Sequence, residues 1–258
     1  MSIRRTLRRW KDEGRFPRLL RASESVRDSL IRPVQRPLVP LVVRQLKNTG
    51  RIDDLDELLT RASTGYLRTI VPLQRRSEIL GLLQAVRALE PRRVVEIGTA
   101  NGGTLFLFTR VAADNARILS VDLPSGAFGG EANEWKHPIW EAFVTNQQTL
   151  RLIRADSHAR STSDIVKNDL AGEPIDFLMI DGDHSYEGVK QDFETYAPLV
   201  RAGGIIAFHD ICKHPHGAGG EVHRFWPEIR EGRDYVELRE RPDDGFGIGY
   251  IRVGRTDT

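Results

Sequence analysis

The chain has 258 residues, of which 40% are hydrophobic and 29% charged. That length is ample for one α/β core with an appendage and short for two full domains, and the composition excludes wholesale disorder and a fibrous protein. Charge is divided unevenly, because residues 1–50 hold 13 Lys and Arg against 4 Asp and Glu, whereas the remainder holds 25 against 32. The total of +2 therefore hides a basic segment of +9 beside an acidic one of −7.

One cysteine, Cys212, cannot form a disulfide within the chain, so nothing in the sequence asks for an oxidising compartment. No apolar run approaches the roughly 18 to 20 residues that span a bilayer, and the basic start lacks the apolar stretch of a secretory signal. We therefore expect a cytoplasmic protein without a transmembrane segment.

The start of the chain predicts a short basic helix. Ile3, Leu7 and Trp10 recur at helical spacing among arginines. Such an amphipathic segment suits an anionic membrane surface or a polyanion. It equally suits docking on a second copy of the chain, because three turns are marginally stable alone. We favour this packing arm, which allows a homo-oligomer through the N-terminal helices.

Regular elements follow in chain order. Helices are expected over 54–62 and over 77–89, the second capped by Ser77 and closed by Pro91. Short β-branched runs then alternate with helical periods, at 94–97, 118–122, 150–156, 175–181, 203–210, 235–238 and 247–253. Strands separated by helices predict an α/β fold with a mostly parallel sheet covered on both faces. The last two runs leave no room for a helix between them and predict an antiparallel hairpin.

A glycine-rich turn follows the first strand. It reads Glu-Ile-Gly-Thr-Ala-Asn-Gly-Gly-Thr over residues 96–104, where glycines permit a tight turn and the close approach of a ligand to the main chain. The spacing differs from the GxGxxG of dinucleotide sites, and no lysine follows to make a phosphate loop. The turn therefore suits a nucleoside without a pyrophosphate and argues against a nicotinamide-dependent oxidoreductase.

Acidic residues end the next strands, where ligands bind in parallel sheets. Asp122 is placed to accept hydrogen bonds from a ribose diol, while Asp156 can accept from an adenine amino group and Ser157 can donate to a ring nitrogen. Any one of them alone is better explained as a helix cap or a loop residue. Three at successive strand ends behind a glycine-rich turn favour a binding site.

These motifs together resemble a known enzyme family. The stretches EIGTANGG, SVDLP, RADSH, FLMIDGDHSYEGVKQDFE and GGIIAFHD are similar to those of class I S-adenosylmethionine-dependent methyltransferases. They look most like the branch of antibiotic-sugar and cephalosporin-pathway O-methyltransferases, with catechol O-methyltransferase more distant. The resemblance covers residues 74–252. It implies a Rossmann-like, doubly wound sheet of seven strands with the last antiparallel, a methyltransferase domain over 74–258 and a basic helical extension over 1–73.

The resemblance also implies that residues at the ends of the first four strands bind S-adenosylmethionine. The methionine end, the ribose and the adenine would be held in that order by the glycine-rich turn, by Asp122 and by Asp156 with Ser157. The full expected cofactor-binding set is Glu96, Gly98, Asn101, Gly102, Asp122, Asp156, Ser157 and Asp181.

Methyl transfer to a hydroxyl requires removal of the acceptor proton, by a general base or with help from a metal. Asp181, His209 and Asp210 offer a metal site from two adjacent strand ends, and His184 offers a base. In metal-dependent sugar O-methyltransferases, the matching positions hold magnesium and supply the base, but the resemblance implies two oxygen ligands where this chain has His209 and Asp210. Because magnesium prefers oxygen ligands and imidazole suits transition metals, the presence and identity of a divalent metal stay open.

Other interpretations of the histidines also stay open. His184 can instead cap the following helix, and His209 can be a strand histidine bonded to a carbonyl. His214, His216 and His223 lie in a polar, glycine-rich stretch, which suits a surface loop better than a second metal cluster.

A loop over 123–140 is expected to recognise the acceptor and to close over the strand ends as a lid. Its aromatic residues Phe128, Trp135 and Trp140 either stack on the acceptor or anchor the loop to the domain.

The leading hypothesis is an S-adenosylmethionine-dependent O-methyltransferase for a small hydroxylated acceptor, such as a sugar or a glycosylated metabolite. The alternatives are a cofactor-binding regulatory module without turnover and a nucleic-acid methyltransferase. Only the basic arm supports nucleic acid as a partner, and the −7 of the remaining chain argues against a broad basic groove.

Overall fold

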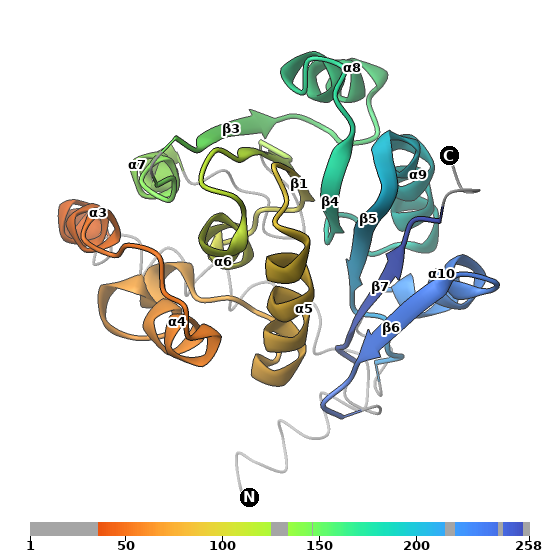
Figure 1. Ribbon diagram of the computed structural model, residues 1–258, viewed down its shortest axis with the longest axis horizontal. Coiled ribbons are helices and arrows are strands. Elements are labelled where there is room, and N and C mark those ends of the chain that lie inside the picture. The colour runs from red at the N-terminus through yellow and green to blue at the C-terminus, as the bar shows by residue number, and fades with distance from the viewer. Residues whose placement is uncertain (1–35, 125–133, 146, 215–219, 242–244, 255–258) are drawn as a thin grey trace, which may run out of the picture.

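A seven-stranded sheet with helices on both faces forms the centre of the molecule (Figure 1). The computed structural model describes residues 36–124, 134–145, 147–214, 220–241 and 245–254. The strands are β1 (Arg93–Ile97), β2 (Arg117–Asp122), β3 (Thr149–Arg154), β4 (Ile175–Ile180), β5 (Val200–His209), β6 (Asp234–Leu238) and β7 (Ile248–Arg252). Their order across the sheet is β3-β2-β1-β4-β5-β7-β6.

The direction of the strands follows the prediction. Parallel pairing joins β3, β2, β1, β4 and β5, and β7 runs antiparallel to both β5 and β6. The chain builds outward from β1 through β2 to β3 and then returns to place β4 on the other side of β1. Such a reversal opens a crevice beyond the carboxyl ends of the strands. The predicted fold class, with its antiparallel last strand and terminal hairpin, is confirmed.

Alternate strand residues point to opposite faces of the sheet and form two cores. On β4, Phe177 and Met179 face the first core, while Leu178 and Ile180 face the second. Every residue of this strand is buried. A parallel strand covered on both sides needs apolar residues at nearly every position, which explains why the β4 sequence is a continuous apolar run instead of an alternating one.

Helices cover both faces of the sheet (Figure 1). The first core is covered by α3 (Val39–Lys47), α4 (Leu55–Ala62), α5 (Arg76–Leu89), α6 (Gly103–Val111) and α7 (His137–Glu141), and the second by α8 (Arg160–Asp169), α9 (Tyr186–Tyr196) and α10 (Val222–Arg230). Short 3-10 helices lie at Arg36–Leu38, Gly65–Ile70, Glu134–Lys136 and Ala197–Leu199. In the part of the chain that the structure describes, every helix is too short or too polar to cross a bilayer.

The described part of the N-terminal extension belongs to the first core. Val42 of α3 and Leu58 of α4 are fully buried in the same cluster as Leu82 of α5 and Phe106 of α6. Burial of such side chains stabilises the fold by about 1.5–3 kcal/mol each, so these helices form an integral layer. The basic helix expected over residues 3–10 lies outside the described residues, and the domain boundary near residue 74 stays a prediction.

Local signals place some helix ends and miss others. α4 begins after Asp54, whose carboxylate accepts from two backbone N–H groups of the first turn at 2.8 and 3.2 Å, as an N-cap residue does. The predicted cap of α5 is wrong, because the N-cap residue is Arg75, and the Ser77 hydroxyl donates instead to Glu240 at 2.8 Å. This hydroxyl contacts the connection between β6 and β7, a partner that a local pattern does not reveal.

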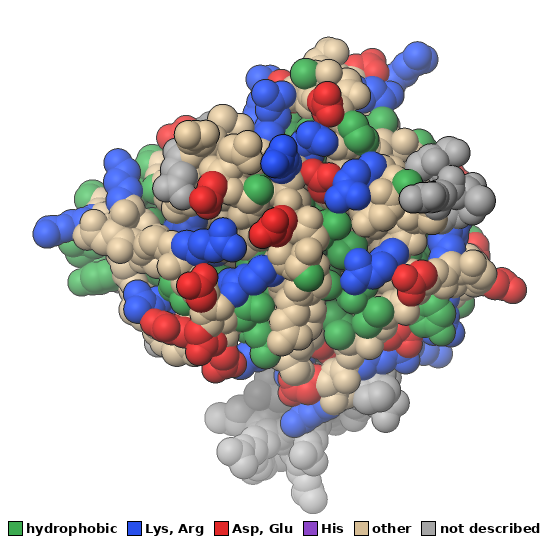
Figure 2. All heavy atoms as spheres, in the orientation of Figure 1, with side chains coloured by type: hydrophobic (Ala, Val, Ile, Leu, Met, Phe, Trp, Pro, Cys, Tyr) green, Lys and Arg blue, Asp and Glu red, His purple; other side chains and the backbone are tan. Residues whose placement is uncertain are grey.

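Charged side chains of both signs are interspersed on the face shown in Figure 2. Opposite charges also pair along a helix, as Arg61 and Glu57 of α4 do at 2.6 Å. Over its described residues this face therefore carries no broad surface of one sign, which nucleic-acid binding would need.

Candidate active site

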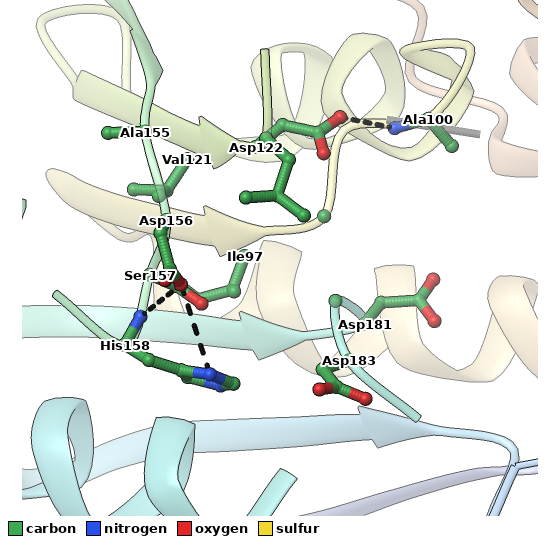
Figure 3. A pocket seen from close by; sticks show the side chains of 13 residues that line it. Ile97, Ala100, Val121, Asp122, Ala155, Asp156, Ser157, His158, Asp181 and Asp183 are labelled. Atoms are coloured by element: carbon green, nitrogen blue, oxygen red, sulfur yellow. Dashed lines mark hydrogen bonds and ion pairs between the residues drawn. The ribbon is translucent and has the colours of Figure 1, made fainter. Parts of the chain in front are cut away.

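A cavity of about 360 Å³ opens beyond the carboxyl ends of the parallel strands, at the reversal of strand order (Figure 3). Its wall includes five of the residues expected to bind a cofactor: Gly98, Asp122, Asp156, Ser157 and Asp181. Four aspartates that end or follow strands line it: Asp122, Asp156, Asp181 and Asp183. The cavity therefore suits a ligand that carries hydrogen-bond donors or positive charge.

Three other residues of the expected cofactor set, Glu96, Asn101 and Gly102, do not line this cavity. Glu96 is fully buried in β1, and burial raises its pKa to about 8. Asn101 accepts a hydrogen bond from Lys136 Nζ at 2.7 Å, and its carbonyl accepts one from Trp140 Nε1 at 3.2 Å. Their assignment to the cofactor stays a prediction.

The glycines of the turn make room for protein groups as well as for a ligand. Gly98 and Gly102 have φ angles of 93° and 86°, in the left-handed region that favours glycine. A Cβ at Gly98 would overlap the backbone of Asp181, and one at Gly102 would overlap the indole of Trp140. The glycine spacing therefore also reflects the close approach of the β4 end and of α7 to the turn.

Asp122 ends β2 and holds the glycine-rich turn. Its Oδ2 accepts from the backbone N–H groups of Thr99 and Ala100, each at 3.2 Å. Burial raises the pKa of this carboxyl, while the guanidinium of Arg154 opposes the shift. Arg154 in turn donates to the Thr99 hydroxyl at 3.0 Å. Asp122 and the glycine-rich turn both line the cavity, and the hydrogen bonds of Asp122 connect the turn to it.

Four polar side chains after β4 and at the end of β5 form a closed group, here called the His–Asp ring: Asp181, His184, His209 and Asp210. His184 lies between the two carboxylates, with Nε2 3.1 Å from Asp181 Oδ1 and Nδ1 3.1 Å from Asp210 Oδ2. His209 Nδ1 is 3.2 Å from an oxygen of each carboxylate. Since Asp181 also lines the cavity, the structure brings all the predicted catalytic and metal-ligand residues together beside it.

The His–Asp ring favours charged histidines. Burial by itself lowers the pKa of His184, but its hydrogen bonds to the two carboxylates raise it to about 11. Burial likewise lowers the pKa of His209, and the charge of Asp181 brings it above its usual range. Burial raises the pKa of Asp181, but the two histidines hold it well below its usual range. At neutral pH neither histidine is a free base in this arrangement.

Gln74, just before α5, completes the surroundings of Asp181. Its Nε2 donates to Asp181 Oδ2 at 2.9 Å, and its Oε1 is buried without a hydrogen-bond partner. Gln74 therefore binds Oδ2 of Asp181, while Oδ1 of Asp181 contacts His184 and His209. No sequence motif marks Gln74, because the contact joins residues far apart in the chain.

The structure decides against both alternative interpretations of the ring histidines. The helix after His184 is capped by Ser185, whose hydroxyl accepts from the Gly188 N–H at 3.0 Å. The capping alternative for His184 is therefore wrong. The Nδ1 of His209 contacts carboxylates instead of the expected carbonyl, and its Nε2 is buried without a hydrogen-bond partner.

Trp140 anchors its segment to the domain. Its side chain is 1% exposed, and the guanidinium of Arg154 lies 4.8 Å from its ring centre. Trp135 is partly buried against the first core. Of the two interpretations, anchoring therefore holds for these tryptophans, whereas Phe128 lies outside the described residues. The lid stays a prediction.

The histidines beyond β5 take separate positions. The His223 ring contacts the carbonyl oxygen of Gly220 through Nδ1 at 3.1 Å, and the His214 ring packs near Phe246. His216 lies outside the described residues. The described histidines of this stretch do not form the alternative second metal cluster, since no such group is found among the described residues.

No sequence motif marks Arg154 and His158, two residues near the cavity, although both flank predicted residues. Arg154 ends β3 just before Asp156, and His158 follows directly after Ser157 and lines the cavity. The signal that points to them is position alone, within the stretch RADSH at a strand end.

Comparison with known proteins identifies a family and uncharacterised relatives. Residues 95–211 match a family described as a methyltransferase domain. A protein of Sinorhizobium fredii is 34% identical over 177 residues, which are 66% of this chain and 18% of that protein. A protein of Acanthamoeba polyphaga mimivirus is 34% identical over 119 residues, 45% of this chain and 50% of that protein. The chain spans half or less of the length of these relatives.

Solved structures share the fold at low sequence identity. The O-methyltransferase TomG from Streptomyces achromogenes, involved in tomaymycin synthesis and solved with SAM, has a TM-score of 0.51 at 19% identity, over 79% of this chain and 92% of that one. An O-methyltransferase from Bacillus cereus, solved with SAH, has a TM-score of 0.52 at 19% identity, over 82% and 97%. MycE from the mycinamycin biosynthetic pathway, solved with Mg, SAH and mycinamycin VI, has a TM-score of 0.51 at 20% identity, over 81% and 55%. At these identities the likeness establishes the fold alone.

Proposed function

Because the chain carries a methyltransferase domain with the class I fold, we propose that it transfers a methyl group from S-adenosylmethionine to a hydroxyl group of a small acceptor. The observation that carries the proposal is the cavity at the reversal of strand order, which shares Asp181 with the His–Asp ring. Cofactor binding and acid–base chemistry thereby meet at one place in the fold.

The chemistry of the cavity wall fits this cofactor. Asp122 can accept from the ribose hydroxyls, and Asp156 with Ser157 can bind the adenine, each from the end of a successive strand. The carboxylates of the wall also suit the positive charges of the sulfonium and the amino group. When bound, S-adenosylmethionine supplies a methyl group that the positive sulfur has already activated.

His184 is the group that accepts the proton of the acceptor hydroxyl in this proposal. Both of its ring nitrogens face carboxylates at 3.1 Å in the described arrangement. To act as a base, the ring must lose its extra proton, and the hydroxyl must replace one carboxylate while the other keeps the ring oriented. The side chain is 28% exposed, so its edge can be reached.

A metal on Asp181, His209 and Asp210 does not fit the described arrangement. Their carboxylate oxygens contact His184 and His209 Nδ1 or accept from Gln74, and no group of three or more His, Cys, Asp or Glu side chains among the described residues is arranged to hold an ion. The proposed proton transfer therefore relies on His184 and the carboxylates that flank it.

The acceptor we propose is a sugar or a glycosylated metabolite. This finer assignment rests on the resemblance of residues 74–252 to antibiotic-sugar O-methyltransferases, and MycE, which has the same fold, was solved with mycinamycin VI. A homo-oligomer through the N-terminal helices, membrane contact by the basic arm and a cytoplasmic location stay predictions.

Calorimetric titration with S-adenosylhomocysteine tests the cofactor. We expect saturable binding that Asp122→Ala weakens about tenfold or more, because a charged hydrogen bond contributes about 1.5–3 kcal/mol. Absence of binding, or binding indifferent to the substitution, would contradict the proposal. Transfer is tested by incubating hydroxylated acceptors with methyl-labelled cofactor. Cofactor binding without transfer to any of them would favour the regulatory module instead.

A further inference from the structure

A buried carboxylate of α9 lies beneath the cofactor cavity. Asp192 is 0% exposed, and neither of its oxygens has a hydrogen-bond partner of good geometry. Its Oδ2 lies next to Gly182, which lines the cavity: a Cβ built on that glycine would be 3.5 Å from this oxygen. Its Oδ1 is 3.4 Å from His158 Nε2. Because a buried charge is costly unless it is paired, the Asp192 carboxylate favours the protonated form of His158.

His158 links the buried carboxylate to the cavity that it lines. Its Nε2 faces α9, at 3.2 Å from the Gly188 carbonyl oxygen and 3.4 Å from Asp192. Its Nδ1 is 3.8 Å from Asp156 Oδ1, and the same oxygen accepts from the His158 backbone N–H at 2.9 Å (Figure 3). At 3.8 Å the contact of Nδ1 with Asp156 is an ion pair and not a hydrogen bond, so it attracts the carboxylate only when the ring is cationic. A charged His158 therefore restrains the Asp156 carboxylate from one side.

Helix α9 also holds the backbone of this segment. The Tyr196 hydroxyl donates to the Ser157 carbonyl at 2.8 Å, and Gln191 Nε2 donates to the His158 carbonyl at 3.3 Å. These contacts fix the segment on the helix that begins directly after His184 and Ser185. The pair of His158 and Asp192 is thus a built part of the cavity wall.

We propose that His158 is a cofactor-binding residue and that Asp192 positions it, keeping the ring charged so that it holds Asp156 in place for the adenine amino group of S-adenosylmethionine. This inference rests on the proposed function, because the ligand is the cofactor named there. His158 lines the cavity, whereas Asp192 acts through His158.

The charge of His158 sets a pH dependence. The titratable groups that face it are Asp192 from α9, Asp156 from its own segment and Asp183 after β4. The carboxylate of Asp192, 3.4 Å from Nε2, raises the pKa of His158 to about 9, against the opposing effect of burial. The ordinary value is about 6.5. The ring therefore stays charged at neutral pH and loses its proton as the pH rises through about 9, so cofactor affinity falls there.

The test compares the parent protein with Asp192→Asn and with Glu194→Gln, by titration with S-adenosylhomocysteine from about pH 6 to pH 10. Glu194 is exposed on the same helix, so its variant removes an equal charge without touching His158. We expect Asp192→Asn to bind about fivefold more weakly at pH 8 and to approach the parent near pH 6, because its His158 titrates closer to the ordinary value. Glu194→Gln should match the parent throughout.

Two further measurements keep the proposal open to refutation if Asp192→Asn folds poorly. His158→Gln changes a side chain outside the apolar core, and it should bind more weakly than the parent at neutral pH and lose the change in affinity near pH 9. The NMR signal of the His158 ring reports its charge directly. Parent-like binding by His158→Gln, or a parent ring that titrates near pH 6.5, would overturn the proposal. A parent that does not bind S-adenosylhomocysteine at any pH would overturn the proposed function instead.

Discussion

Replacing Gly98 with alanine should cost both stability and cofactor affinity, because the turn, the end of β4 and the cavity meet at this residue. Its φ of 93° costs a residue with a Cβ about 1–2 kcal/mol. The new Cβ would also overlap the backbone carbonyl of Asp181, which follows a strand buried on both faces. Overpacking of this kind costs about 1–3 kcal/mol. We therefore expect a total loss of about 2–5 kcal/mol in the free energy of unfolding.

The control is Gly172→Ala. Gly172 has a φ of 74°, and a Cβ there would meet no atom within 4 Å. This variant bears the backbone cost alone, so it should lose about 1–2 kcal/mol. Urea unfolding at unchanged slope measures both losses. Titration of the folded variants with S-adenosylhomocysteine should show weaker binding for Gly98→Ala only, because Asp181 lines the cavity.

Equal losses of stability in the two variants would refute the reasoning, since they would show that the Asp181 backbone moves aside at no cost. A destabilised Gly98→Ala with the affinity of the parent would refute the connection between the turn and the cavity.

Three further predictions concern the reaction. His184→Ala should lower turnover by about 10²- to 10⁴-fold, the usual contribution of a general base, and leave the affinity for S-adenosylhomocysteine within about twofold; loss of binding would assign His184 to the cofactor site. Because the pKa of His184 is raised to about 11 and only the deprotonated ring is a base, the logarithm of turnover should rise by about one per pH unit from about pH 7 to pH 10; a flat profile would exclude His184 as the base. Protein treated with EDTA should keep its turnover, and a loss reversed by added Mg²⁺ would instead place a metal in the His–Asp ring.

Much of the fold follows from the local sequence, because burial on both faces of a parallel strand demands an apolar run such as that of β4. The meeting of Asp122, Asp156 and Asp181 at one cavity also follows from sequence, since parallel strands bring their carboxyl ends to the same edge of the sheet. Neither inference needs a distance between side chains.

Only the tertiary structure decided what depends on contacts across the fold. Ser77 lies inside the first turn of α5 and donates its hydroxyl to Glu240, and Gln74 reaches Asp181 from a segment 107 residues away. The protonation state of the histidines is where the structure differs most from the sequence-based prediction. His184 reads in sequence as a base, but a pKa depends on the distance and burial of neighbouring charges, and two carboxylates at 3.1 Å keep its ring protonated. The sequence by itself determined which residues lie at the carboxyl edge of the sheet. The protonation state of these residues and their contacts were decided by packing between strands that are distant in the chain.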